Sequence, residues 1–231
     1  MLNDIRDFIA SHVETPLVSG FMTWVLIAAW MWFKGWKVQR RYFIASLLTP
    51  LRRIPLWWMC AIIGAVMVVA AEQRPASPAL VAVAMVGVVS SVVDARTHQL
   101  PDTYTAVMAC GVISGIFLAG LTAAQPFILL GKVMTGALLW LVPLWCASRI
   151  PHGMGKGDVK LAPVLGAMLG ILGIQAALTA LILSFVAAGL AALTHIVTGQ
   201  AGTDTRIPMG PWLIGSALLS YLLWGVIPDW L

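Results

Sequence analysis

The stretch "RIPHGMGKGDVKLAPVLGAMLG", residues 149–170, places a glycine-rich polar turn directly before an apolar helix. Asp158 lies at the junction, behind Gly153, Gly155 and Gly157. A carboxylate at membrane depth costs about 2.5–3.5 kcal/mol on insertion scales, so an acidic residue at the end of a span indicates a functional site. The glycines allow positive φ and let another chain approach without a Cβ in the way. An extended peptide could therefore lie against this turn.

The composition shows that this stretch belongs to an integral membrane protein. Of the 231 residues, 60% are hydrophobic and 10% charged, and the mean hydropathy is +0.92, which excludes a soluble globular domain. A helix needs about 20 mainly apolar residues to cross a bilayer. We expect an all-α polytopic bundle of about eight spans, forming one domain over residues 1–231, at these windows: 16–34, 55–71, 77–93, 103–124, 127–148, 160–175, 177–198 and 211–228. The sixth window is short, and a re-entrant segment is the alternative there.

The distribution of Lys and Arg predicts the orientation of the bundle. If the N-terminus is periplasmic, 11 of the 14 basic residues fall on the cytoplasmic side, where positive loops are retained. The net charge of +5 then needs no nucleic-acid partner. The basic segment "KGWKVQRRY", residues 34–42, is better explained by topology and by contact with anionic membrane lipid.

Two carboxylates come from separate spans at the same expected face. Asp94 follows "VAVAMVGVVSSVV" at the inner end of the third span, and Asp158 begins the sixth. Two such groups at similar depth can share a site. Simpler interpretations stay open, since Asp158 could be a helix N-cap and Asp94 could pair with Arg96. Asp102, after Pro101, is interpreted as the N-cap of the fourth span.

Metal binding is not supported by the spacing of possible ligands. His98 and His152 lie in loops near the two aspartates, but no HExxH or CxxC pattern accompanies them. Cys60, Cys110 and Cys146 each fall within an expected span and are interpreted as small apolar residues. We therefore expect no metal and no cofactor.

These motifs resemble those of the type IV prepilin peptidases, which are GxGD-type membrane aspartic peptidases. "GMGKGDVKLA" is similar to their GxGD motif, and "VVDARTHQLPD" resembles their other aspartate motif. "IPMGPW", near the end, resembles an "IPFGPF"-like segment before their last helix, and "RRYFIASLLT" resembles their "RYPLVELLT" stretch. The resemblance covers roughly residues 78–228, and the combination of motifs is more specific than GxGD alone.

The resemblance implies a function and a set of site residues. Asp94 and Asp158 would be the catalytic pair, activating water to remove the short basic leader of prepilins or pseudopilins at the cytoplasmic face of a bacterial inner membrane. The expected substrate-binding and active-site loop residues are Gly153, Gly155, Lys156, Gly157, Lys160, Pro208, Gly210 and Pro211. Whether Lys156 and Lys160 tune the pair or only mark the cytoplasmic side stays open.

The sequence departs from the family pattern in one region. Most bacterial members carry a cytosolic domain with paired CxxC motifs for zinc and an N-methyltransferase activity. Here residues 34–54 are expected to form only a reduced cytoplasmic loop, and they contain no cysteine. The resemblance, with this departure, implies a peptidase without zinc and without methyltransferase activity.

Three other functions remain possible at this point. One is a GxGD peptidase acting on archaellin-like or other membrane substrates. A second is a transporter in which the two aspartates relay protons or cations, although no inverted repeat is visible. A third is a non-enzymatic assembly factor of a pilus or secretion system.

Overall fold

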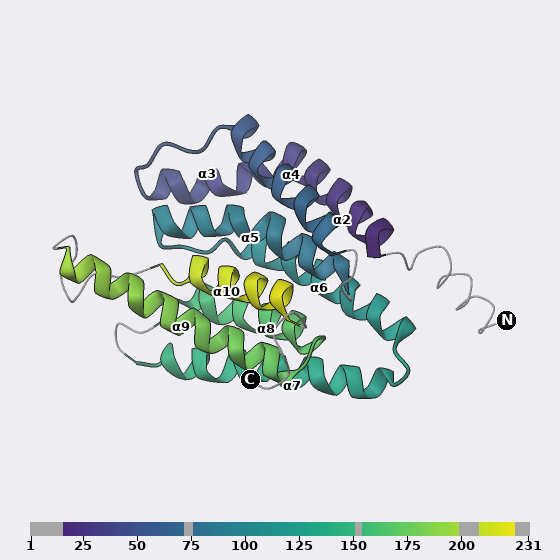
Figure 1. Cartoon of the computed structure of the whole chain (residues 1–231). Coiled ribbons are helices and arrows are strands. Elements are labelled where there is room, and N and C mark those ends of the chain that lie inside the picture. The colour runs from purple at the N-terminus through teal and green to yellow at the C-terminus, as the bar shows by residue number, and fades with distance from the viewer. Residues whose placement is uncertain (1–15, 72–75, 151–153, 199–207, 225–231) are drawn as a thin grey trace.

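A computed structural model describes residues 16–71, 76–150, 154–198 and 208–224 (Figure 1). Within these ranges the chain is entirely helical apart from short turns and links, which confirms the expected fold class. The helices are α2 Pro16–Trp30, η1 Met31–Gly35, α3 Trp36–Ala45, α4 Arg53–Ala70, α5 Ser77–Thr97, α6 Asp102–Thr122, α7 Pro126–Ala147, α8 Lys156–Gly170, α9 Ile174–Val197 and α10 Gly210–Leu223.

Six of the described helices are long and apolar enough to cross a membrane, which makes the chain a multi-pass membrane protein. The first seven expected windows largely coincide with helix, and the eighth, 211–228, does so up to residue 223, since 225–228 lie outside the described residues. Two of these helices are short. α8 has 15 residues and α10 has 14, about 21–23 Å at 1.5 Å per residue, below the roughly 30 Å of a hydrocarbon core. The orientation of the bundle stays a prediction.

The segment 34–54 is not a loop throughout, and this expectation was wrong for its first half. The first helix continues from Leu17 to Ala45 through the π-helical segment η1, a length of 29 residues. The buried Gln39 explains how the remaining link folds back. Its Nε2 donates to the carbonyl of Leu51 at 2.9 Å, and the Leu51 N–H donates to its Oε1 at 3.2 Å. Gln39 thereby satisfies the backbone of the link where no helix does.

α5 is the central helix of the bundle. From Ser77 to Val89 all but one of its residues are buried, because α2, α4, α6 and α10 pack around it (Figure 1). The outer helices instead expose large apolar side chains such as Ile62, Phe117 and Phe127. This distribution suits a bundle surrounded by lipid, where every backbone polar group must be satisfied inside the helices.

Glycines let α7 and α8 cross at backbone contact. Gly166 and Gly170 are four residues apart on α8, and a Cβ at Gly166 would collide with the carbonyl oxygen of Gly136 on α7. A Cβ at Gly170 would lie 2.6 Å from the carbonyl oxygen of Lys132. Small residues at this spacing are typical of close helix packing in membranes. The crossing fixes the position of α8 and hence of Asp158 in its first turn.

A single glycine separates α8 from α9. Gly173 has φ of +142°, which other residues rarely adopt, and it separates Ile171 at the end of α8 from Ile174 at the start of α9. α8 begins at the same end of the bundle at which α5 finishes and α10 starts, on the left in Figure 1.

We expect Gly166→Ala to lower the free energy of unfolding by about 1–3 kcal/mol, because the added methyl forces α7 and α8 apart. Gly189→Ala on α9 is the matched control, since nothing lies within 4 Å of its added Cβ. Thermal unfolding of the two variants in the same detergent measures the difference. Equal unfolding temperatures would contradict the close crossing.

Candidate active site

A cavity of about 380 Å³ lies at the end of the bundle where α5 finishes and α6 and α8 begin. It combines the two expected aspartates with polar residues from three other segments. Its lining consists of Tyr42, Asp94, His98, Gln99, Leu100, Asp102, Gly155, Lys156, Gly157, Asp158 and Lys160.

Asp94 lies in the last turn of α5 and is only 4% exposed. Its Oδ2 accepts a hydrogen bond of 2.9 Å from the backbone N–H of Gly210, the first residue of α10. A backbone N–H at a helix N-terminus stabilises a nearby carboxylate by its hydrogen bond and by the helix dipole. The described residues include no ion pair between Asp94 and Arg96, so that interpretation was wrong.

Asp158 is the third residue of α8 and is 8% exposed. The N-cap is Gly155, so the interpretation of Asp158 as the N-cap was wrong. Burial, and next the nearby charge of Asp94, raise the pKa of Asp158, while a hydrogen bond from the Gly155 backbone opposes them, and the resulting pKa is about 7. Its Oδ1 is buried and has no hydrogen-bond partner among the described residues.

These two environments differ in a way that assigns the proton. Two buried carboxyl groups that share a cavity do not both ionise readily, so the pair keeps one proton near neutral pH. Both carboxyl groups accept a backbone hydrogen bond, Asp94 from Gly210 and Asp158 from Gly155, but only Asp158 has a buried oxygen without a partner among the described residues. Asp158, with its unpartnered oxygen and raised pKa, is suited to hold the proton. One acid and one base in a single cavity can activate water against a carbonyl group.

Four of the eight expected loop residues line this cavity. Gly155, Lys156, Gly157 and Lys160 line it, whereas Gly210 contacts Asp94 from one side. Pro208 and Pro211 flank Gly210 and are not among the lining residues. Gly153 and His152 lie outside the described residues.

Leu100 holds the two glycine-containing segments together. A Cβ on Gly157 would lie 2.8 Å from Leu100 Cβ, and a Cβ on Gly210 would lie 2.8 Å from Leu100 Cδ1. The link between α5 and α6 therefore packs against both α8 and α10. These glycines are needed for this close approach, a packing role that the sequence did not reveal.

Asp102 and Lys160 form an ion pair at the mouth of the cavity. Lys160 Nζ lies 2.8 Å from both carboxylate oxygens of Asp102, and the side chains are 57% and 68% exposed, respectively. The N-cap of α6 is Pro101, so Asp102 is its first helical residue and the N-cap interpretation was wrong. An exposed pair of this kind contributes about 0–1 kcal/mol. It connects α6 to α8.

Sequence reasoning missed Tyr42, Gln99 and Leu100 as lining residues. Tyr42 belongs to α3, far from the motifs along the chain, and only the similarity of "RRYFIASLLT" to the family pattern could have indicated it. His98 lines the cavity as the C-cap of α5, with a left-handed φ of 51°. The described residues contain no group of three or more His, Cys, Asp and Glu side chains that could hold a metal ion.

Comparisons with known proteins show similarity to one family of membrane peptidases. The family described as "Type IV leader peptidase family" matches residues 79–193, which include both aspartates. Three similar proteins are all named "Prepilin leader peptidase/N-methyltransferase". The one from Aeromonas salmonicida is 28% identical over 86% of this chain and 65% of its own length. The one from Aeromonas hydrophila is 28% identical over 93% and 70%. The one from Dickeya chrysanthemi is 33% identical over 60% and 47%.

Over residues 79–193, which are just under half of the chain, the sequence resembles the type IV leader peptidase family. It spans slightly less than two thirds of the length of the Aeromonas salmonicida relative. No solved structure matches the chain significantly.

We expect Gly210→Ala to lower the free energy of unfolding by about 1–3 kcal/mol. The added Cβ would lie 2.7 Å from Asp94 Oδ2 and would disrupt the hydrogen bond that the Gly210 N–H donates to that oxygen. Gly215→Ala on the same helix is the control, since nothing lies within 4 Å of that position. Denaturation of both variants in matched detergent provides the comparison. A Gly210 variant as stable as the Gly215 variant would refute the contact.

Proposed function

We propose that this chain is an aspartic endopeptidase that removes the leader peptide from type IV prepilins or pseudopilins. The observation that carries the proposal is the pair of buried carboxyl groups, Asp94 and Asp158, in one cavity at the end of an apolar bundle. Similarity to the type IV leader peptidase family and the names of the relatives support this substrate class.

The first step uses both members of the pair. Asp94, as the carboxylate, takes a proton from a water molecule in the cavity, and the water oxygen attacks the scissile carbonyl carbon. Asp158, as the acid, gives its proton to the carbonyl oxygen. The product of this step is a neutral gem-diol, with Asp94 protonated and Asp158 ionised.

The second step returns the pair to its starting state. Asp94 donates its proton to the peptide nitrogen while the carbon–nitrogen bond breaks. Asp158 takes a proton from one hydroxyl of the diol as the carboxylic acid of the leader forms. Each turnover therefore consumes one water molecule and leaves one proton on the pair. General acid–base transfer of this kind contributes about 10²- to 10⁴-fold, and positioning of the peptide bond must supply much of the rest.

The place of the cavity suits a substrate that is itself a membrane helix. The cavity lies at the end of the bundle where α5 finishes and α8 begins. With 11 of the 14 basic residues on the same expected side, we place it at the cytoplasmic face of a bacterial inner membrane. Only the substrate backbone around the scissile peptide bond, at the membrane boundary, would then have to unwind. The apolar part of the substrate would stay in lipid.

The proposal covers cleavage and not methylation. The relatives are named for both activities. This chain has three cysteines, Cys60, Cys110 and Cys146, without CxxC spacing, and its first helix extends through the region in which the family's zinc-binding domain is expected. We therefore assign this chain the peptidase activity alone.

Asp94→Asn and Asp158→Asn are each expected to slow cleavage of a co-expressed prepilin by at least about 10²-fold, because each removes one half of the proton transfer. Asp102→Asn is the matched control, since it alters a third carboxylate at the cavity mouth that is exposed and paired with Lys160. We expect that variant to lose less than about tenfold, because exposed ion pairs contribute little. Leader removal is followed by gel shift.

The outcomes of this experiment separate the alternatives. Processing that survives both Asn substitutions would contradict the catalytic pair and favour an assembly factor. Prepilin left intact by the wild-type protein, with an archaellin-like substrate cleaved, would favour a related peptidase of different substrate class. A proton or cation relay would show pH-dependent ion flux into vesicles that depends on the aspartates without any cleavage.

The rate of cleavage should fall as the pH rises above about 7. The pKa of Asp158 is raised to about 7, so its acid form is present below that pH and is lost above it. The dependence of kcat/KM on pH in detergent measures this limb. A rate that stays constant from neutral to clearly alkaline pH would show that Asp158 is not the proton donor.

A further inference from the structure

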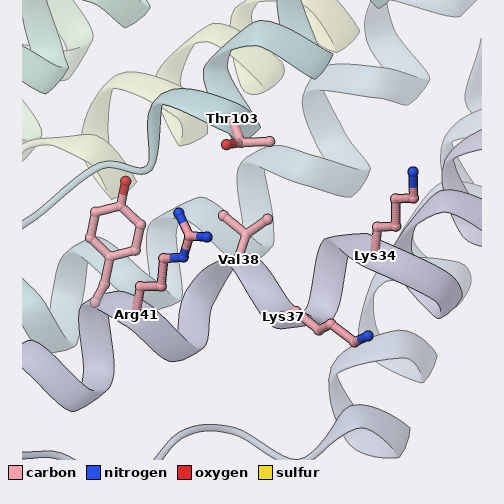
Figure 2. A pocket seen from close by; sticks show the side chains of 6 residues that line it. Lys34, Lys37, Val38, Arg41 and Thr103 are labelled. Carbon is pink, nitrogen blue, oxygen red and sulfur yellow. The ribbon is translucent and has the colours of Figure 1, made fainter.

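We propose that a second, basic pocket binds the phosphate group of an anionic phospholipid. This basic pocket is formed by Lys34, Lys37, Val38, Arg41, Tyr42 and Thr103, and its volume is about 290 Å³ (Figure 2). The volume is at the lower limit of small-molecule sites, which suits a headgroup and not a whole lipid. The inference does not depend on the proposed function.

The charge of the basic pocket is of one sign. Lys34, Lys37 and Arg41 follow one another at spacings of three and four residues, which places them on one face of the continuous helix η1–α3. Figure 2 shows these side chains below Thr103 of α6. None of the three makes an ion pair with a carboxylate among the described residues. Their charges therefore favour a ligand with negative charge.

The opposite wall adds neutral donors. Thr103 lies in the first turn of α6, where free backbone N–H groups and the positive end of the helix dipole favour an anion. The neighbouring Asp102 would repel an anion, but Lys160 neutralises its carboxylate at 2.8 Å from both oxygens. Cationic side chains on one wall and a helix N-terminus on the other are the combination that phosphate groups bind.

The depth of the basic pocket favours a lipid as the source of the phosphate. The helix Leu17–Ala45 has 29 residues, about 43 Å, so its last turns extend beyond a hydrocarbon core of roughly 30 Å into the headgroup region. Beside it, Arg53 lies 3.6 Å from the ring of Trp32, an aromatic–basic contact typical of the membrane interface.

The basic pocket also adjoins the candidate active site, because Tyr42 lines both cavities. A bound headgroup would hold α3 against α6 at this point. It would thereby set the position of Tyr42 relative to the cavity that contains Asp94 and Asp158.

The test is binding of short-chain phosphatidylglycerol to the purified full chain in neutral detergent, measured by native mass spectrometry. The triple variant Lys34→Gln, Lys37→Gln, Arg41→Gln is expected to bind about tenfold or more weakly, because each cation near the headgroup contributes on the order of 1 kcal/mol. The matched control replaces three exposed arginines outside the basic pocket with Gln and loses the same charge: Arg40, Arg52 and Arg149. It should bind like the wild type.

A second variant tests the basic pocket independently of whether the triple variant folds. Thr103→Trp leaves all three cations in place and fills the basic pocket with a bulky side chain, so it should also lose binding. If the pocket triple variant and the control triple variant bind phosphatidylglycerol equally weakly, binding depends on the total surface charge and the proposal is overturned. Retained binding in Thr103→Trp would overturn it too.

Competition distinguishes the sources of phosphate. Glycerol phosphate and inorganic phosphate should compete poorly, and phosphatidylcholine should not bind at this site. Displacement of phosphatidylglycerol by inorganic phosphate at comparable concentration would assign the basic pocket to a soluble phosphate and overturn the lipid assignment. Displacement by an acidic peptide from the substrate would assign it to the substrate instead, with the same consequence.

Discussion

The repulsion between two carboxyl groups buried in one cavity is the constraint on which the site depends. Asp94 and Asp158 are almost fully buried where α5 ends and α8 begins. Burial and the charge of Asp94 raise the pKa of Asp158 to about 7, while Gly210 donates its N–H to Asp94. This asymmetry separates an acid from a base on chemically identical side chains.

The other helices hold the carboxyl groups of Asp94 and Asp158 in place, because both groups are buried from solvent. α5 carries Asp94 at the centre of the molecule, and the glycine crossing of Gly136 with Gly166 fixes α8. α10 contributes its first amide to Asp94, although it lies more than a hundred residues further along the chain. The basic pocket adjoins the cavity, and Tyr42 lines both of them. Helix packing, the site and the membrane interface are thus coupled over a short distance.

The sequence predicted what depends on local pattern and missed what depends on packing. Apolar windows located the helices, and the glycine-rich turn located Asp158, because both signals lie within a few neighbouring residues. The segment 34–54 was misread, since its polar composition conceals a helix that extends beyond the bilayer. The partner of Asp94 could not be predicted, because a backbone amide carries no sequence signature. Asp102 was misinterpreted for a different reason: helix α6 begins at Asp102 with Pro101 as its N-cap, a difference of one residue that the sequence pattern does not specify.

Infrared spectroscopy of the protonated carboxyl group tests the central claim most directly. In the wild-type protein, we predict one buried protonated carboxyl signal that disappears with a midpoint near pH 7, is absent in Asp158→Asn and persists in Asp102→Asn. Asp94→Asn should move the midpoint to lower pH, because it removes the neighbouring negative charge. A midpoint that Asp94→Asn leaves unchanged would show that the two groups do not interact, which would contradict the account.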